Sequence, residues 1–464
     1  MDKLSNSYWL MKRVLLLIVS VLYIGSVAAQ NSTGKFNGLW NGVIEAGGQE
    51  IKMEFEILEQ DGVPVGKMNA QGVKGIPATV KTDGAAIEIE IKQIGMKYSG
   101  FLLGNNISGT FSQNGFNTAM VLYPGKLEVR RPQTPKAPFP YRTEEVTFEN
   151  KAEGAVLSGT LTYPAEYEKM KHSNVPVVVM VTGSGLQNRD EEIFDHKPFA
   201  VIADYLARNG IASLRYDDRG AGKSAGDIAS ATSENFAADA KAGVKFVRDL
   251  KKFGKVGILG HSEGGTIAVM LAGERVPDFI VSMAGVATQG LDCLVWQNVE
   301  LLAQKGVPQQ MSEDYGKALR ELYLQKTAQG EKVEQPEQFV EEICRKAGVS
   351  LHQSLKTNLV AVAATQSKWL DFFVMYNPAE AVGKIKCPVM ALNGSLDMQV
   401  PAAENLGTLE KLLPQNGKHF FKGYPDKNHL FQSCTKATSL QYGEIEETIA
   451  SEVLEDIVKW VKGL

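Results

Sequence analysis

Polar and apolar residues alternate with a period of two between residues 30 and 130. The runs EIKMEFEIL and AAIEIEIKQ each place their apolar residues on one face and most of their charged residues on the other. Turn-forming pairs separate such runs, as at Asp83-Gly84 and Asn114-Gly115. The pattern predicts a small antiparallel β domain over residues 30–130, in the form of a half-barrel or a sandwich.

A proline-rich segment, RPQTPKAPFPY, follows at residues 131–141. Prolines at this density oppose regular structure and favour an extended spacer. We therefore expect a linker there, joining the β domain to a second domain over residues 142–464.

The second domain alternates strand and helix patterns. PVVVMVTG and KVGILG are typical of strands buried on both faces, whereas FAVIADYLARNG and SENFAADAKAGVKFVRDLKK have helical periodicity. Gly210 is the expected C′ residue of the first helix and Ser233 the expected N-cap of the second. The alternation predicts an α/β fold with a mostly parallel sheet and helices on both faces. Residues 290–380 have no strand signal and predict a helical insertion between two core strands.

The N-terminal residues have the pattern of an export signal. Lys12 and Arg13 precede the apolar run VLLLIVSVLYIGSV, and small residues lead up to Ala29. This predicts a signal peptide over residues 1–29. A retained N-terminal anchor is the alternative, although the run is shorter than the ~20 residues that cross a bilayer. We expect an exported protein, periplasmic or secreted, with no integral membrane segment after cleavage.

Composition excludes some classes of function. A net charge of −4 gives no basic surface for nucleic acid, and 44% hydrophobic with 22% charged residues is ordinary for a globular protein. The cysteines form no C-x-x-C pair and indicate no metal or redox site; they are Cys293, Cys344, Cys387 and Cys434. Export permits disulfides, but free buried thiols are the preferred interpretation.

One motif imitates a nucleotide site. RGAGKS, at residues 219–224, resembles the end of a phosphate-binding loop. Asp217 stands where that motif requires a glycine, five residues before Gly222. We expect this segment to hold a loop in place by pairing of Asp and Arg side chains.

The stretch VGILGHSEGGTIA carries the candidate chemistry. It places Ser262 in a G-x-S-x-G pentapeptide between a strand and a helix, which is the setting of a nucleophile elbow. Gly260 and Gly264 are the expected consequence of so sharp a turn, because bulky neighbours would collide. The helix N-terminus favours negative charge at the same place. A structural glycine-rich turn is the alternative.

A serine nucleophile needs a base, which an acid orients. His429 follows the last strand in YPDKNHLF and is the predicted base, while His196 could line the site or have a structural role. His261 is expected to face away. Asp397 in NGSLDMQVP is the predicted acid. Asp371 and Asp426 are its alternatives.

An oxyanion hole requires two N–H donors. The amide of Glu263, directly after the nucleophile, is the first. The loop TGSGLQNRDEE supplies the second, from Ser184 or Gly185, because its glycines let the backbone approach a substrate oxygen. This chemistry calls for no metal and no cofactor.

Several stretches together resemble a known family. PVVVMVTGSGLQNRDE, GILGHSEGG, NGSLDMQVP and YPDKNHLFQ are similar to the exported α/β-hydrolases of Bacteroidota, which are related to EstD-type carboxylesterases. GLWNGVIEAGGQEIKMEFEI resembles that family's leading β domain. The resemblance implies an α/β-hydrolase fold with Ser262, Asp397 and His429 as the catalytic triad. It also implies activity on short acyl esters, although some members are named by analogy with serine aminopeptidases.

Three functions follow as hypotheses. The leading one is a serine carboxylesterase that cleaves a small-molecule ester through an acyl-enzyme, with the helical insertion as a lid. The second is an aminopeptidase-like peptidase with the same triad, in which acidic groups of the segment EQPEQFVEEICRK hold a free amine. The third is a non-enzymatic role in which the β domain binds a ligand.

Overall fold

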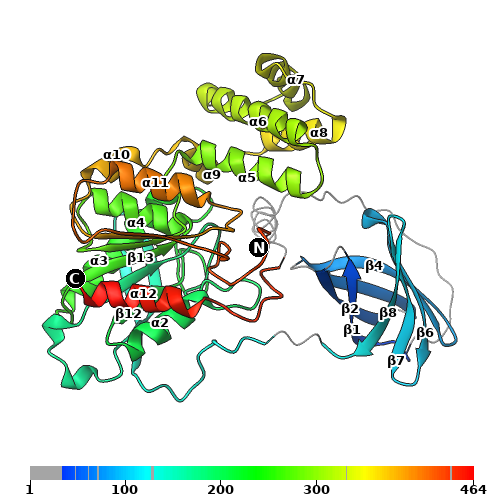
Figure 1. The fold of residues 1–464 in the computed structure, drawn as a ribbon, viewed down its shortest axis with the longest axis horizontal. Coiled ribbons are helices and arrows are strands. Elements are labelled where there is room, and N and C mark those ends of the chain that lie inside the picture. Colours follow the sequence, from blue (N-terminus) through cyan, green and yellow to red (C-terminus); the bar gives the residue numbers. More distant parts are fainter. Residues whose placement is uncertain are drawn as a thin grey trace. The chain divides into compact units, whose positions relative to one another are not determined.

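The computed structural model describes residues 34–46, 49–60, 62–70, 73–126, 130–330, 332–438 and 441–464. The predicted signal peptide lies outside these residues. The chain forms two compact units (Figure 1). Among the described residues, one unit contains residues 34–132 and 441–446, and the other contains residues 133–438 and 447–464.

The first unit is an antiparallel barrel. Its strands are β1 (Gly38–Ala46), β2 (Gln49–Gln60), β3 (Val63–Ala70), β4 (Val73–Asp83), β5 (Ala86–Ile91), β6 (Met96–Leu103), β7 (Asn106–Gln113) and β8 (Phe116–Pro124). Each strand pairs with its neighbours in sequence, and β1 also pairs with β8, which closes the sheet. The predicted half-barrel or sandwich is therefore wrong, because alternation within a strand does not reveal which strands pair at the two ends.

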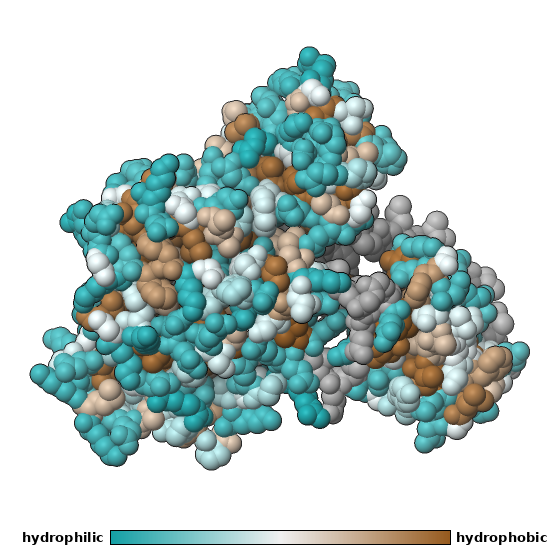
Figure 2. Space-filling model, viewed as in Figure 1, coloured by the Kyte–Doolittle hydropathy of each residue, from teal (hydrophilic) through white to brown (hydrophobic). Residues whose placement is uncertain are grey.

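The barrel interior follows the predicted alternation. Ile87, Ile89 and Ile91 of β5 are at most 1% exposed and lie in one core with residues of the other strands. At the β7–β8 turn, Asn114 and Gly115 have φ values of 49° and 90°, as a tight hairpin turn requires. Some apolar side chains remain on the outer surface, among them Phe101 (60% exposed) and Leu103 (63% exposed) of β6. Figure 2 shows brown patches of this kind over the barrel.

The second unit contains a mixed sheet in the order β16-β15-β14-β13-β11-β12-β10-β9. The strands are β9 (Thr143–Asn150), β10 (Ala155–Thr162), β11 (Val177–Val181), β12 (Ala212–Tyr216), β13 (Val256–His261), β14 (Ile280–Met283), β15 (Val389–Gly394) and β16 (Phe420–Tyr424). Strands β11 to β16 run parallel to one another, and β10 is antiparallel to both of its neighbours, β12 and β9. The predicted mostly parallel sheet is confirmed.

Helices cover both faces of this sheet (Figure 1). They are α2 (Pro198–Arg208), α3 (Ser233–Asp249), α4 (Glu263–Gly273), α11 (Ala402–Leu412) and α12 (Ser451–Lys462). Val177, Val179 and Val181 of β11 pack in one core with α3, α4 and α11. Val178 and Met180 pack in the other core with α2 and α12. A run buried on both faces is apolar at every position for this reason.

The ends of two helices test the predicted caps. Gly210 has a φ of 86° directly after the C-cap Asn209 of α2, as predicted. The N-cap of α3 is Thr232 rather than Ser233: the Thr232 hydroxyl accepts from the Glu234 amide, and the Asn235 side chain accepts from the Thr232 amide. Ser233 is instead buried as the first helical residue.

A helical insertion separates β14 from β15, as predicted. It consists of α5 (Gly290–Gln304), α6 (Gln309–Gln329), α7 (Pro336–Ala347), α8 (Gln353–Ala364), α9 (Lys368–Met375) and α10 (Ala379–Lys384). Leu319, Leu322 and Leu359 lie in a core of the insertion's own. Short 3₁₀ helices lie at Lys92–Ile94, Tyr167–Lys169 and His172–Asn174. Across the described residues, no helix combines the length and the apolar character that a membrane crossing requires.

Candidate active site

Ser262 occupies a strained turn between β13 and α4. Its φ of 54° and ψ of −120° lie outside the regions that a serine ordinarily adopts. A Cβ on Gly260 would lie 2.0 Å from the carbonyl oxygen of Gly264, and one on Gly264 would lie 2.0 Å from that of Val181. Both positions therefore exclude any larger residue, which is the steric basis expected for the elbow.

Asp397 and His429 form a buried hydrogen-bonded pair. Nδ1 of His429 lies 2.8 Å from Oδ2 of Asp397, and the two residues are 2% and 5% exposed. The carboxylate also accepts from the Asn393 side chain at 3.0 Å and from the amides of Gln399 and Val400 at 2.7 and 2.9 Å. Because a carboxylate only accepts, the hydrogen bond to Asp397 places a proton on Nδ1 of His429 and leaves Nε2 as the nitrogen that is not bonded to the acid.

The loops that carry this pair are joined through their backbones. The Leu396 amide donates to the Lys427 carbonyl at 2.9 Å. Gly394, at the end of β15, permits this approach, since a Cβ there would lie 2.2 Å from the Lys427 oxygen. Gly394 thus lets two loops approach each other: the loop after β15 that carries Asp397 (the acid loop) and the loop after β16 that carries His429 (the base loop).

The elbow and the base loop lie side by side. The ring centroids of His261 and His429 are 4.8 Å apart, and His261 directly precedes Ser262. Within the described part of the chain, the Ser262 hydroxyl makes no hydrogen bond to His429. The structure therefore brings together the acid and the base by a direct contact, and places the serine in the adjoining turn.

The predicted oxyanion donors surround the same turn. A Cβ on Gly183 would lie 3.2 Å from Cβ of Ser262, so the loop after β11 lies against the elbow. The Gly183 amide already donates to Oε1 of Glu191, at 2.7 Å. The amides of Ser184, Gly185 and Glu263 make no hydrogen bond within the described residues. Ser184 and Gly185 both remain candidates for the second donor.

The Glu263 side chain is a buried acid with several donors around it. Its Oε1 accepts from the Ser233 hydroxyl at 2.6 Å and from the Trp369 indole N–H at 2.8 Å. The Ser184 side chain also hydrogen-bonds to this carboxyl. Burial raises the pKa of Glu263 above its ordinary value, and these hydrogen bonds oppose the shift. The Glu263 carboxyl on α4 thus contacts Ser233 of α3, Ser184 of the loop after β11 (the oxyanion loop) and Trp369 of the insertion.

The segment RGAGKS, which resembles the end of a phosphate-binding loop, has a structural role. Asp217 accepts from the Arg189 guanidinium at 3.0 and 2.8 Å and from the Lys223 amide at 3.1 Å. A Cβ on Gly222 would lie 2.4 Å from the Asp217 carboxylate. The prediction that Asp and Arg pairing holds this loop is confirmed.

The alternative residues are placed elsewhere. His196 is buried, and its Nδ1 lies 2.8 Å from the Thr448 hydroxyl. Asp371 forms an ion pair with Lys326 inside the insertion. In the described residues, neither Asp371 nor Asp426 makes a hydrogen bond to the His429 ring. Asp397 is the acid that the structure brings to His429.

Sequence reasoning missed the partners of the elbow. The His261 ring lies against that of His429 and bonds to Glu191 and to the His429 carbonyl, not to Ser262. Glu191 and Trp369 bond to residues of the elbow and were not predicted. The one available signal was His261 itself, a titratable residue directly after the apolar run VGILG, because a buried polar group needs a partner.

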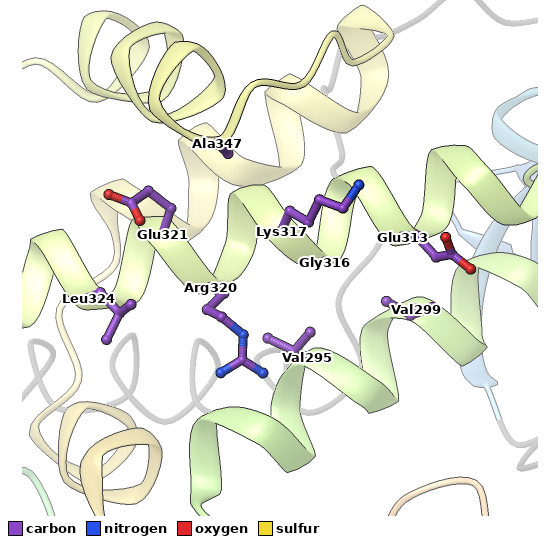
Figure 3. Close-up of a pocket in the computed structure, with 9 residues that line it drawn as sticks. All are labelled: Val295, Val299, Glu313, Gly316, Lys317, Arg320, Glu321, Leu324 and Ala347. Carbon is purple, nitrogen blue, oxygen red and sulfur yellow. The ribbon is translucent and has the colours of Figure 1, made fainter.

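One cavity lies within the helical insertion and another lies beside the elbow. The first, of about 320 Å³, is lined by Val295 and Val299 of α5, by residues of α6 and by Ala347 of α7, and Figure 3 shows Arg320 of α6 beside Val295. None of the triad candidates lines it. The other adjoins the elbow, between Glu263 and Phe373, and has a volume of only about 10 Å³. That space is about the size of one water molecule.

Comparison with known proteins places the second unit in a family. The profile of the X-Pro dipeptidyl-peptidase family, S15, matches residues 153–423, more than half of the chain. The chain belongs to this family. The S15 match contains Ser262 and Asp397 and ends six residues before His429.

Proteins similar to this S15 chain include an esterase and an iminopeptidase. Esterase EstD of Thermotoga maritima is 24% identical over 287 residues, which cover 62% of each protein. The chain thus spans less than two thirds of that relative. Among solved structures, a Pyrococcus furiosus esterase is 16% identical (73% of this chain, 99% of that one, TM-score 0.42). Proline iminopeptidase of Mycobacterium smegmatis is 14% identical (69% and 98%, TM-score 0.41). The predicted relation to EstD-type esterases is confirmed.

Proposed function

We propose that this chain is a serine carboxylesterase that cleaves small-molecule esters with short acyl groups. The observation that carries the proposal is the buried hydrogen bond of 2.8 Å between Asp397 and His429, beside the strained turn of Ser262. The relation to Esterase EstD supports an ester as the substrate.

The geometry supports a two-step reaction. His429 takes the Ser262 proton on Nε2 while the Ser262 oxygen attacks the acyl carbon, and Asp397 stabilises the imidazolium that forms. The amides of Glu263 and of Ser184 or Gly185 bind the oxyanion. His429 then protonates the leaving alkoxide. Water, deprotonated by the same ring, hydrolyses the acyl-enzyme and restores the Ser262 hydroxyl.

The insertion packs against the elbow. The cavity beside the elbow, lined by Phe373 of α9 and Gly290 of α5, holds about 10 Å³, which is too small for any acyl group. An acyl group in that place requires α5 or α9 to move. We therefore propose that the insertion is a lid over the site.

A peptidase is the second candidate, because the matching family is that of an X-Pro dipeptidyl-peptidase. It would use the same triad. Two of the three acidic residues of α7 have other partners: Glu341 pairs with Lys356 at 2.7 Å, and Glu342 pairs with Lys346 at 3.2 Å. The third, Glu337, has no ion pair within the described residues. The relation to Esterase EstD is what favours the esterase.

The test compares aryl esters of increasing acyl length with aminoacyl and X-Pro arylamides, on the purified protein. We expect kcat/KM to be highest for esters with short acyl groups and to fall by about 10³-fold or more in Ser262→Ala. Asp397→Asn should lower kcat with little effect on KM. Higher kcat/KM for arylamides with a free amine would contradict the esterase, and full activity in Ser262→Ala would remove the serine from the mechanism.

A further inference from the structure

A second histidine–carboxylate pair lies behind the triad candidates. Nδ1 of His261 lies 3.0 Å from Oε1 of Glu191, and Nε2 of the same ring lies 3.0 Å from the backbone carbonyl of His429. The same Glu191 oxygen accepts from the Gly183 amide at 2.7 Å. His261 and Glu191 are 7% and 4% exposed. The two side chains thus join the oxyanion loop, the elbow and the base loop.

The partners decide the protonation of the His261 ring. The carbonyl of His429 can only accept, so Nε2 of His261 must carry a proton. The Gly183 amide can only donate, so Oε1 of Glu191 accepts from it at 2.7 Å and also faces Nδ1 of His261. A carboxylate in this place requires a proton on Nδ1 as well. With both ring nitrogens protonated, the His261 ring is an imidazolium.

We propose that Glu191 and His261 form a buried ion pair that positions the base loop, with the His261 imidazolium donating to Glu191 through Nδ1 and to the His429 carbonyl through Nε2. Neither residue touches the reacting atoms, so both are positioning residues. The bond to the carbonyl fixes the backbone of His429 while its ring stays bonded to Asp397. This role in catalysis rests on the proposed function.

The charges around His261 are consistent with an imidazolium. Burial alone would lower the pKa of His261, but the charge of Glu191 and the hydrogen bonds to Glu191 and His429 outweigh it and raise the pKa. Asp397, on the loop after β15, adds a further negative charge. The other neighbouring rings are those of His429 and the uncharged Phe431.

The first test is independent of activity. The protein has six histidines, so ¹⁵N-histidine labelling allows each ring to be followed by NMR, with His261→Gln identifying the His261 signals. We expect both ring nitrogens of His261 to remain protonated at pH 8, and Glu191→Gln to make the ring neutral at that pH. A neutral His261 in the unmodified protein at pH 7 would overturn the ion pair.

The second test uses two variants that each keep one half of the interaction. The amide nitrogen of a glutamine falls near the position of Nε2, and that of an asparagine near Nδ1. His261→Gln therefore keeps a donor for the His429 carbonyl, whereas His261→Asn keeps the contact with Glu191. We expect His261→Asn to lower kcat about 10- to 100-fold with KM unchanged within about twofold, and His261→Gln to recover about tenfold of that loss.

The outcomes separate this inference from the proposed function. Melting temperatures of both variants confirm that they fold. Equal kcat in the two variants, or a change in KM instead of kcat, would refute the positioning role. If the unmodified protein hydrolyses no ester, the proposed function fails, while the NMR result still decides whether the ion pair exists.

Discussion

Glu263 shows how one residue serves the site through both its backbone and its side chain. Its amide is one of the predicted oxyanion donors, and its side chain is a carboxyl that is only 3% exposed. The raised pKa of Glu263 means that the folded protein binds the proton of this carboxyl more tightly than the unfolded chain does.

This raised pKa predicts a pH-dependent effect of Glu263→Gln. Between the ordinary value near 4.5 and the folded value, the folded state holds more protons than the unfolded state, so the stability of the unmodified protein falls as pH rises. Because glutamine does not titrate, the stability of the Glu263→Gln variant does not fall with pH for this reason. We expect the melting temperature of Glu263→Gln, relative to the unmodified protein, to increase from pH 4.5 to pH 8.

The exposed Glu234, on α3, offers the matched control. Glu234→Gln should show no such trend, because its carboxyl lies in water in both states. A difference between Glu263→Gln and the unmodified protein that does not change with pH would contradict the prediction.

At the scale of elements, α9 ties the helical insertion to the elbow. Trp369 on α9 donates to the Glu263 carboxyl at 2.8 Å, and its ring stacks on Phe373 at 5.6 Å between centroids. Ser233, the first residue of α3, donates to the same carboxyl oxygen. Displacement of α9 therefore removes the Trp369 indole N–H from the buried Glu263 carboxyl and leaves that carboxyl with one donor fewer.

Trp369→Phe tests this link by removing the indole N–H. We expect a loss of about 1–3 kcal/mol in the free energy of unfolding, because a buried acceptor loses a donor. A double-mutant cycle with Glu263→Leu, which removes the acceptor, should show a coupling energy of about 1 kcal/mol, measured by chemical denaturation. Trp460→Phe is the control, since the Trp460 indole donates to the Lys418 carbonyl at an exposed position. No coupling between Trp369 and Glu263 would exclude the link.

At the scale of the whole molecule, the two units do not depend on disulfides within the described residues. The structure leaves the four predicted free thiols unpaired, with Cys293 and Cys344 buried. Burial raises the pKa of Cys293 to about 12 and that of Cys387 to about 11. Export of the chain stays a prediction. Burial makes the thiols of Cys293 and Cys344 unreactive in either compartment, whereas Cys387 and Cys434 are half-buried.

A reducing agent should therefore have little effect. We expect the melting temperature of the full chain to change by less than about 1 °C when dithiothreitol is added, since there is no cross-link to break. A decrease of about 5 °C or more is what the loss of a disulfide would cause, and it would show that cysteines pair in solution.

The sequence by itself determined the local features. Alternation of period two predicted the β strands of the first unit, and runs such as PVVVMV predicted strands buried on both faces, because local patterns reflect how each element meets its core. The glycines around Ser262 and the chain order of Ser262, Asp397 and His429 likewise pointed to the elbow and to a pair that the structure joins by a hydrogen bond.

Only the tertiary structure decided the contacts between distant segments. The β1–β8 pairing closes the barrel, and the bonds from His261 to Glu191 and to the His429 carbonyl cross 70 and 168 residues of the chain. No local pattern reports them, because a hydrogen bond depends on where two backbones meet and on which groups burial has removed from water. The partner of a buried polar group is therefore a property of the fold, whereas the need for a partner is a property of the residue.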